Sequence, residues 1–155
     1  MSVILSINNL SKSFGSLLVT DDFSAELNAG EALGIIGPNG AGKSTLFNLI
    51  TGGLTPDKGQ ISFDGNDVTR MSAHDRCRAG MGRSYQIPHP FGGMTVFENL
   101  LVGAAFGGKQ NEVESYDPCV EILSLTGLEA KANTLAGSLT LLARTRLEMA
   151  RALAT

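Results

Sequence analysis

The chain has 155 residues, of which 43% are hydrophobic and 17% charged, with a formal net charge of -3 at pH 7. This length suits one ordinary domain, and the composition is that of a globular protein, which excludes a disordered one. The slightly acidic balance gives no support to nucleic-acid binding, which favours a basic surface. Cys77 and Cys119 lie far apart without metal-ligand spacing, so we interpret them as reduced thiols of a cytosolic protein.

The first predicted elements are two strands. Residues 3–8 and 22–27 each alternate apolar and polar side chains, which predicts two half-buried antiparallel strands. Phe14 lies near the turn between them. A lone phenylalanine at such a place is explained equally well by core packing or by a ring that stacks on a flat base.

A glycine-rich motif follows at residues 37–45. Its members are Gly37, Pro38, Asn39, Gly40, Ala41, Gly42, Lys43, Ser44 and Thr45. They fit the phosphate-loop template G-x-x-x-x-G-K-[ST] at every fixed position. Gly40 and Gly42 allow the backbone to coil so that successive amides point at one phosphate. Lys43 offers a charge to the β- and γ-phosphates, and Ser44 offers a hydroxyl to Mg²⁺. The motif predicts binding of a nucleoside triphosphate.

The context of the motif supports this interpretation. Residues 31–36 are nearly all apolar, and we expect a short buried strand there. Residues 45–50 predict the first turns of a helix that ends at Gly52 and Gly53. A strand, a glycine-rich turn and a helix N-terminus form an anion site, because unpaired amides and the helix dipole act in the same direction.

Short elements follow the predicted phosphate-loop helix. Residues 60–63 predict a strand, and Ser72 with Asp75 resembles the N-terminal cap of a short helix that closes at Gly80. The prolines in residues 87–90 then halt regular structure. His74 and His89 have no other ligand at metal spacing, so we interpret them as solvated or locally hydrogen-bonded.

The remainder of the chain predicts three helices. Thr95 and Glu98 form a capping box that begins a helix over residues 96–103. Asn111 with Glu114 caps a second helix that ends before Gly127. The apolar positions expected in that helix are Val113, Val120, Leu123 and Leu125.

The third predicted helix covers residues 141–153 and is amphipathic. One face carries Arg144, Glu148 and Arg151. The opposite face carries Leu142, Met149 and Leu153. We therefore expect residues 1–86 to be a β-rich nucleotide-binding core and residues 95–155 to be a helical subdomain.

The order of these features resembles the ATP-binding subunits of ABC transporters over essentially the whole chain. The order is Phe14, residues 37–45, Gln86 and the helical segment that ends at residues 146–153. Residues 80–88 and 91–102 are most similar to the ATPase subunits of branched-chain amino acid importers. The resemblance implies an α/β fold: a P-loop NTPase core with an antiparallel β subdomain and a helical subdomain, lacking the C-terminal part of its sheet.

The resemblance also implies roles for individual residues and partners. Phe14 matches an aromatic that stacks on adenine, and Gln86 matches a glutamine that, with Ser44, ligates Mg²⁺ and senses the γ-phosphate. The segment after Gln86 matches the surface that receives the membrane-spanning permease subunits. In such proteins two ATP-binding subunits close on two ATP molecules at the cytoplasmic side of the inner membrane, where they are peripheral.

The chain departs from the family in its signature region. Residues Leu139, Thr140, Leu141, Leu142 and Ala143 stand where the family reads L-S-G-G-Q. Thr140 keeps a hydroxyl, but leucines replace glycines that let backbone amides approach the partner's γ-phosphate. Two interpretations stay equally open: a half-site that contributes poorly to the partner's ATP site, or a variant loop that still presents its helix N-terminus.

A second departure is that the catalytic strand of the family would follow Thr155. The general base is expected beyond this residue, so the chain contains no catalytic residue and resembles a truncation. We expect weak ATP binding, negligible turnover and self-association through an apolar sheet edge. The leading function is the ATPase subunit of an importer for branched-chain or similar amino acids. The alternatives are a non-transport ABC ATPase and a nucleotide-binding regulatory module that does not hydrolyse ATP.

Overall fold

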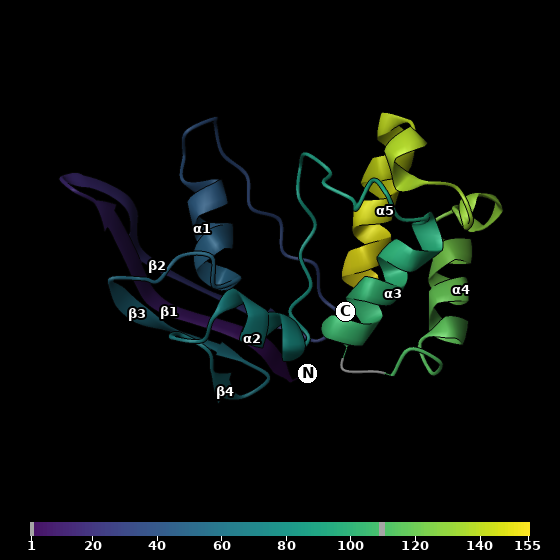
Figure 1. Cartoon of the computed structure of the whole chain (residues 1–155). Helices are drawn as coiled ribbons and strands as arrows, with labels where there is room; N and C mark the ends of the chain where they lie inside the picture. Colours follow the sequence, from purple (N-terminus) through teal and green to yellow (C-terminus); the bar gives the residue numbers. More distant parts are fainter. Residues whose placement is uncertain (1, 109–110) are drawn as a thin grey trace. The chain divides into compact units, whose positions relative to one another are not determined.

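The computed structural model describes residues 2–108 and 111–155 and separates them into two compact units (Figure 1). The first unit is Met1–Arg76 and the second is Cys77–Thr155. No helix in these described ranges is long and apolar enough to cross a membrane.

The first unit contains a four-stranded antiparallel sheet with the order β2-β1-β3-β4 (Figure 1). The strands are β1 (Val3–Phe14), β2 (Leu17–Asn28), β3 (Lys58–Phe63) and β4 (Asn66–Asp67). β1 and β2 form a tight hairpin in which Phe14 pairs with Leu17 across a turn at Gly15, whose φ is 60°. The two antiparallel strands expected at the start of the chain are therefore confirmed, and both are longer than their sequence patterns.

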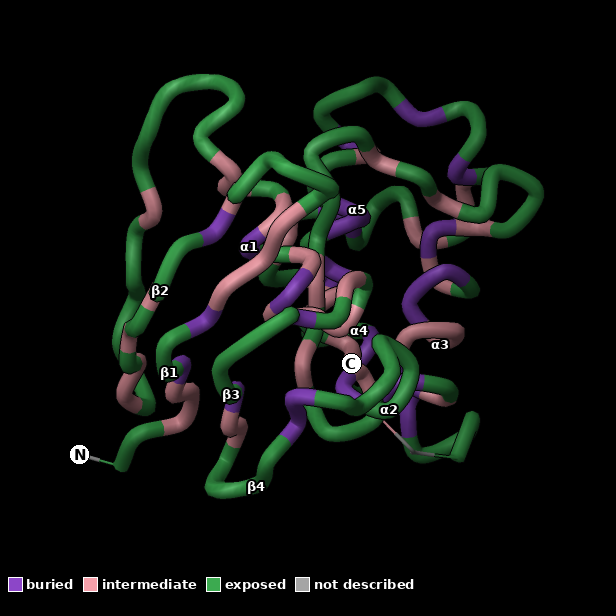
Figure 2. The backbone as a smooth tube through the Cα atoms, turned by 90° about the vertical axis from the view of Figure 1, so that its left-hand side faces the viewer, coloured by how far each residue is buried: buried purple, intermediate pink, exposed green. Residues whose placement is uncertain are grey.

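The core of this unit lies between the sheet and the helix α1 (Lys43–Ile50). Leu10 of β1 and Ile61 of β3 are fully buried, and α1 contributes Leu46 and Leu49. Figure 2 shows buried stretches of backbone in these elements in purple. These two leucines are three residues apart and so lie on one face of the helix. Burial of this face orients α1, whose first turn follows the glycine-rich loop.

The strand expected at residues 31–36 is not present, and this prediction is wrong. The segment forms neither helix nor strand, Leu33 is 54% exposed and Ile36 is 96% exposed. A β-strand needs a neighbour that pairs with its N–H and C=O groups. Within the described residues, no strand of the sheet pairs with this segment. Apolar composition alone therefore does not make it a buried strand.

The second unit is helical. The helix α2 (Ala73–Arg78) spans the boundary between the units, and α3 (Val96–Phe106), α4 (Tyr116–Leu125) and α5 (Leu141–Leu153) follow, with two short 3-10 helices, η1 (Glu129–Lys131) and η2 (Ala136–Ser138). The hydrophobic core of this unit is formed by α3, α4, α5 and the segment that connects α4 to α5. The buried side chains are Val96, Leu100, Ala104, Cys119, Leu123, Leu128, Ala136, Leu139, Ala143, Leu147 and Ala150.

Two of the three predicted helix caps, those at Ser72 and Thr95, are confirmed, and the one at Asn111 is corrected. Ser72 Oγ accepts from the Asp75 amide at 3.2 Å, before the first helix of this region. Thr95 and Glu98 form the capping box of α3, with the Thr95 amide donating to Glu98 Oε2 at 2.6 Å. Asn111 Oδ1 accepts from the Glu114 amide, but the turn that it caps precedes α4, which begins at Tyr116.

The apolar faces expected for the last two helices are corrected by the structure. In α4 the buried residues are Cys119 and Leu123, one helical turn apart, whereas three of the expected positions are exposed: Val113, Val120 and Leu125. In α5 the face expected to be apolar is also exposed, with exposed fractions of 64% for Leu142, 54% for Met149 and 61% for Leu153.

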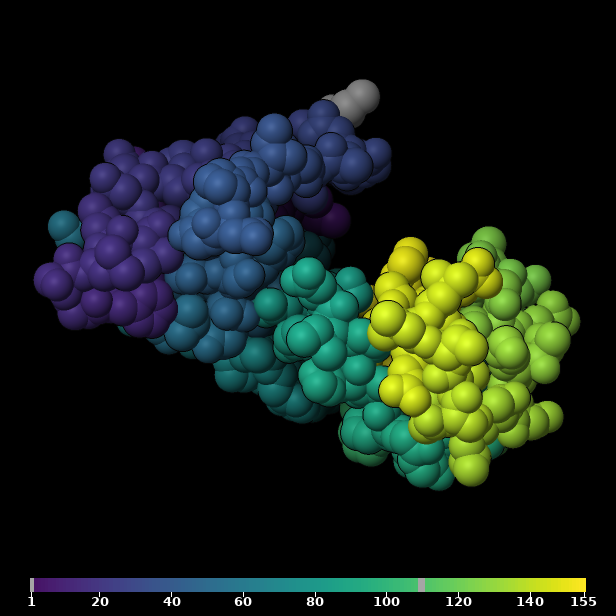
Figure 3. Space-filling model, turned by 90° about the horizontal axis from the view of Figure 1, so that it is seen from above, coloured from purple at the N-terminus to yellow at the C-terminus, as the bar shows by residue number. Residues whose placement is uncertain are grey.

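The buried face of α5 instead carries two alanines, one leucine and one carboxylate, which are Ala143, Leu147, Glu148 and Ala150. Small side chains let α5 approach α3 closely. Gly103 of α3 shows this directly, because a Cβ atom there would lie 3.0 Å from the carbonyl oxygen of Arg151. Part of α5 lies at the surface of this unit, where it is drawn in yellow in Figure 3.

Candidate nucleotide-binding site

The glycine-rich loop bends sharply into α1 because two of its glycines adopt left-handed backbone angles. Gly40 has φ 84°, and Gly42, the N-cap residue of α1, has φ 81°. A Cβ atom at Gly42 would also lie 2.9 Å from the carbonyl oxygen of Val19 in β2, whereas a Cβ at Gly40 would meet no atom within 4 Å. Gly42 is therefore required by both conformation and space, and Gly40 by conformation alone.

The side chain of Lys43 binds the backbone at the start of this loop. Its Nζ donates to the carbonyl oxygen of Gly37 at 2.7 Å and to that of Pro38 at 2.6 Å. An ammonium group has three hydrogens, and these two bonds hold it against the start of the loop. The positive charge is thus held by the backbone at the place where the sequence predicts phosphates.

The N-terminus of α1 adds a second source of positive potential. In α1, all of whose residues are described, the first turn contains no acidic side chain, and the N-cap residue is a glycine, which has no side chain that could cap the helix. The amides of the first turn lack intrahelical acceptors, and the helix dipole concentrates partial positive charge there. Ser44, in this turn, is exposed, and Thr45 is half-buried. The loop, the ammonium group and the helix terminus together favour a phosphate group or another anion.

The C-terminus of α1 is held by Arg76, a residue that sequence reasoning missed. This arginine is 1% exposed. Its Nη1 donates to the carbonyl oxygens of Leu49 and Ile50 at 2.7 Å and 2.6 Å, and its Nη2 donates to that of Thr69 at 3.0 Å. Its Nε donates to Met71 O at 3.2 Å. The cation complements the negative end of the helix dipole and satisfies carbonyls that lack intrahelical donors.

Gly52 makes room for this arginine. Its φ is 80°, and a Cβ atom there would lie 2.9 Å from the Ala73 amide nitrogen and 3.1 Å from Arg76 Nε. The glycine pair after α1 was a sequence signal for the end of the helix. The same signal indicates a close approach of backbone or side chain, but it does not identify the group that approaches.

Phe14 lies at the end of β1 and is 47% exposed, so it is not a core residue. The Nζ atom of Lys12 lies 5.7 Å from the centre of its ring and also forms an ion pair with Asp57 at 2.8 Å. The hydrogen bond from Lys12, followed by one from the Ser13 amide, holds the pKa of Asp57 below its ordinary value. The partly exposed ring leaves aromatic surface that could stack on a flat ligand.

Gln86 and the signature region belong to the second unit. Gln86 is exposed in a bend. Thr140 is the N-cap residue of α5, and its Oγ1 accepts from the Ala143 amide at 3.4 Å. Leu141 and Leu142 are 72% and 64% exposed in the first turn. The flanking members Leu139 and Ala143 are buried in the helical core. The leucine side chains thus stand at a helix N-terminus that glycines would leave open.

Comparison with known proteins finds ATP-binding proteins of more than one kind of transport system. Residues 20–155 match a family model described as "ABC transporter". A probable branched-chain amino acid transport ATP-binding protein LivG of Methanocaldococcus jannaschii is 44% identical over 100 residues, which are 64% of this chain and 39% of that protein. The lipopolysaccharide export system ATP-binding protein LptB of Escherichia coli K12 is 33% identical over 150 residues, which are 97% of this chain and 62% of that protein.

A comparison of the fold with solved structures finds an ATP-binding cassette as well. A solved ATP-binding cassette of an ABC transporter in its ADP conformation matches with a TM-score of 0.85 and 34% identity, covering 99% of this chain and 65% of that chain. The chain therefore spans 39% of the LivG relative, 62% of the LptB relative and 65% of the solved cassette.

Proposed function

The chain belongs to the ABC transporter family, and from this premise we propose that it binds ATP with Mg²⁺ as an ATP-binding subunit of a transporter. The observation that carries the proposal is the geometry around Lys43. Its ammonium group is held over the loop by Gly37 and Pro38, directly before a helix whose first turn offers unpaired amides. Residues 37–45 hold the triphosphate.

Individual residues take further roles in this proposal. Phe14 stacks on the adenine ring, and its exposure supports that role. Ser44 and Gln86 ligate Mg²⁺ through a hydroxyl and an amide oxygen, which are hard ligands of the kind that Mg²⁺ prefers. Residues 1–86 act as the nucleotide-binding core, and residues 95–155 act as the helical subdomain.

For the transported substrate we propose branched-chain or similar amino acids, taken up by an importer. The proposal is supported by the 44% identity to the LivG protein. Export of lipopolysaccharide is a second candidate, because the LptB relatives, at 33% to 36% identity, match over 97% to 99% of this chain. The partners are membrane-spanning permease subunits and a second ATP-binding subunit, and the location is the cytoplasmic face of the inner membrane. Co-purification with tagged permease subunits of each kind separates the two candidates.

The signature region makes the two ATP sites of such a pair unequal in our proposal. Leu141 and Leu142 place exposed side chains in the first turn of α5, where glycines would have none, and Ala143 is buried in the helical core. We expect single-site knockouts of the assembled transporter to give different hydrolysis rates. Equal rates at the two sites would contradict this part of the proposal.

Calorimetric titration of MgATP into the purified chain tests the central claim. Replacing Lys43 by alanine removes a charge-assisted contact worth about 1.5–3 kcal/mol, which corresponds to roughly 10- to 100-fold weaker binding. Lys58→Ala is the matched control, because Lys58 is an exposed lysine at the start of β3 in the same unit. Equal ATP affinity of the Lys43→Ala and Lys58→Ala variants would refute the proposal.

A further inference from the structure

The segment that follows Gln86 is held at two of its residues by side chains from two helices. Proline has no N–H group, so in residues 88–91 only His89 and Phe91 carry amide hydrogens. The His89 amide donates to Glu148 Oε1 at 2.9 Å, and the Phe91 amide donates to Asn99 Oδ1 at 2.9 Å. Residues 88–91, named here the strap, thus use both of their amides to bind side chains of α5 and α3.

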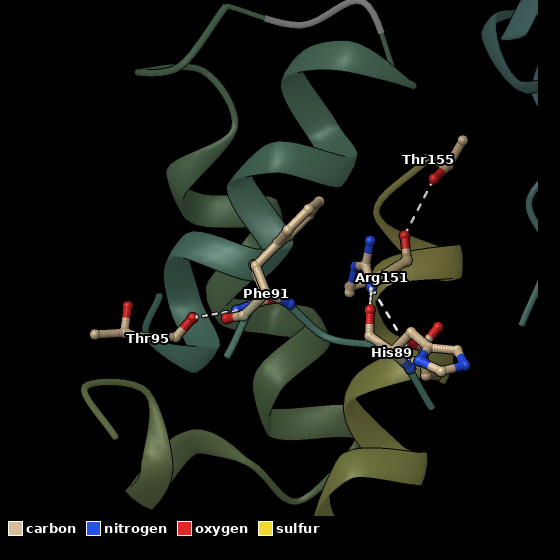
Figure 4. Close-up of polar contacts among 7 residues, drawn as sticks. His89, Phe91, Thr95, Arg151 and Thr155 are labelled. Atoms are coloured by element: carbon tan, nitrogen blue, oxygen red, sulfur yellow. Dashed lines mark hydrogen bonds and ion pairs between the residues drawn. The ribbon is translucent and has the colours of Figure 1, made fainter. Parts of the chain in front are cut away.

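The carbonyl groups of the same two residues are bound as well (Figure 4). The Phe91 carbonyl accepts from Asn99 Nδ2 at 3.1 Å, and the His89 carbonyl accepts from Arg151 Nη1 at 3.2 Å. Arg151 also pairs with Glu148 at 3.1 Å, and its guanidinium group lies 4.9 Å from the centre of the Phe91 ring. Side chains of α3 and α5 therefore bind both the N–H and the C=O group of each of these two residues.

The two side chains that bind the amides are buried. Asn99 is 0% exposed and Glu148 is 5% exposed. A buried carboxylate or amide is unfavourable unless hydrogen bonds replace those it made to water. Glu148 finds them in the His89 amide and Arg151, and Asn99 finds them in Phe91 and in the Thr95 carbonyl at 2.8 Å. The strap therefore supplies part of the hydrogen bonding that allows these polar groups to lie inside the helical unit, together with Arg151 and Thr95.

The chain before Gln86 also lies on α5. A Cβ atom at Gly82 would lie 2.6 Å from the carbonyl oxygen of Ala152, so the backbone at this position rests against the end of the helix. Gln86 is exposed between Gly82 and the strap. The loop that carries Gln86 therefore has both of its ends on α5.

We propose that Glu148 and Asn99 are positioning residues for Gln86: through the strap they tie its loop to α5 and α3, so that nucleotide binding at Gln86 is transmitted to the first turn of α5. This inference rests on the role of Gln86 in the proposed function. In this proposal Glu148 and Asn99 act on Gln86 only through the backbone of His89 and Phe91.

The first test measures amide hydrogen exchange by NMR in the complete chain without nucleotide. We expect Glu148→Met to speed exchange of the His89 amide by about 10-fold, because the hydrogen bond that protects it is lost. Glu148→Gln keeps an acceptor oxygen and should leave His89 protected. Glu121→Met, at an exposed carboxylate of α4, is the matched control. The Leu123 amide reports global unfolding, and unchanged exchange of His89 in Glu148→Met overturns the proposal.

The wild-type chain supplies a measurement that needs no variant, in case Glu148→Met does not fold. A scalar coupling across the hydrogen bond between the His89 nitrogen and the Glu148 carboxyl carbon is expected. Absence of this coupling while the His89 amide is protected overturns the tie to Glu148. Asn99→Leu provides the corresponding test on α3, with faster exchange expected at Phe91.

The second test follows transmission with amide chemical shifts during addition of MgATP. We expect the Gln86 amide to shift in the wild type, Glu148→Gln and Glu148→Met. The amides of Leu141 and Leu142 should shift in the first two proteins only. If they still shift in Glu148→Met, or if Gln86 does not respond to bound MgATP, the inference is overturned while ATP binding stands. Absence of binding by calorimetry in the wild type refutes the proposed function itself.

Discussion

The Nη1 atom of Arg76 lies 2.6 Å from the carbonyl oxygen of Ile50, the last residue of α1. One buried guanidinium group thus closes the end of the helix opposite to the phosphate loop. Its hydrogen bonds go to four backbone carbonyls, and the carboxylate of Asp67 attracts it electrostatically. Peptide dipoles and the carboxylate of Asp67 together balance the charge, so that the orientation of α1 depends on a residue 26 positions further along the chain.

Replacing Arg76 by methionine should destabilise the first unit and weaken ATP binding. Four carbonyl groups lose a charged donor, and the cost is about 3 kcal/mol. Arg78→Met is the matched control, because Arg78 is the exposed arginine of the same helix. Urea unfolding of both variants measures the difference. Equal unfolding midpoints for the two variants would show that the hydrogen bonds of Arg76 do not contribute to the stability of the first unit.

The two glycines of the loop should differ in their tolerance of alanine. At Gly40 the cost is that of a left-handed backbone with a side chain, roughly 1–2 kcal/mol. At Gly42 the same strain is joined by the contact with Val19 in β2, so the loss of stability should be larger. Unfolding experiments on the two variants, with ATP titration of each, measure the ranking. A Gly42→Ala protein as stable as Gly40→Ala would contradict the geometry of the loop.

The apolar segment at residues 31–36 should promote association of the chain. Ile36 is 96% exposed, and an extended segment without a strand partner among the described residues offers unpaired backbone groups. We expect Ile36→Lys to reduce association in sedimentation velocity while changing stability by less than about 0.5 kcal/mol. Leu125→Lys, at an 81% exposed site on α4, is the control. A monodisperse wild-type monomer would contradict the prediction.

Acid should weaken the contact between β1 and the loop that contains Asp57. The hydrogen bonds from Lys12 and from the Ser13 amide lower the pKa of Asp57 in the folded state below its ordinary value of 3.8. A lowered folded-state pKa means that the carboxylate stabilises the fold fully above the unfolded-state pKa. This stabilisation is lost as the pH falls through the folded-state pKa.

The NMR titration of the Asp57 carboxyl carbon measures this pKa directly. Lys12→Met should raise the pKa of Asp57, because the hydrogen bond from Lys12, which lowers this pKa the most, is removed while that from the Ser13 amide remains. Asp57→Asn should reduce the loss of stability on acidification below about pH 4. An Asp57 pKa that does not change in Lys12→Met would contradict this account.

Local signals in the sequence predicted much of the secondary structure. The helix over residues 141–153 and the capping box of Thr95 and Glu98 are confirmed, because caps and helical periodicity depend on residues within four positions of one another. The two antiparallel strands at the start of the chain are also confirmed, because each strand shows its own alternation of apolar and polar residues and a short turn joins them. The phosphate loop was likewise identified from nine consecutive residues, 37–45.

The sequence by itself determined where the nucleotide loop lies and which family the chain resembles, since both depend on contiguous motifs. Only the tertiary structure decided that most of residues 31–36 are exposed, that Arg76 closes α1 and that Glu148 is buried against the strap. Each of these outcomes depends on a partner outside its own local pattern. The physical reason is that burial and hydrogen-bond satisfaction are properties of pairs of groups brought together in space, which the spacing of residues along one helix or strand does not specify.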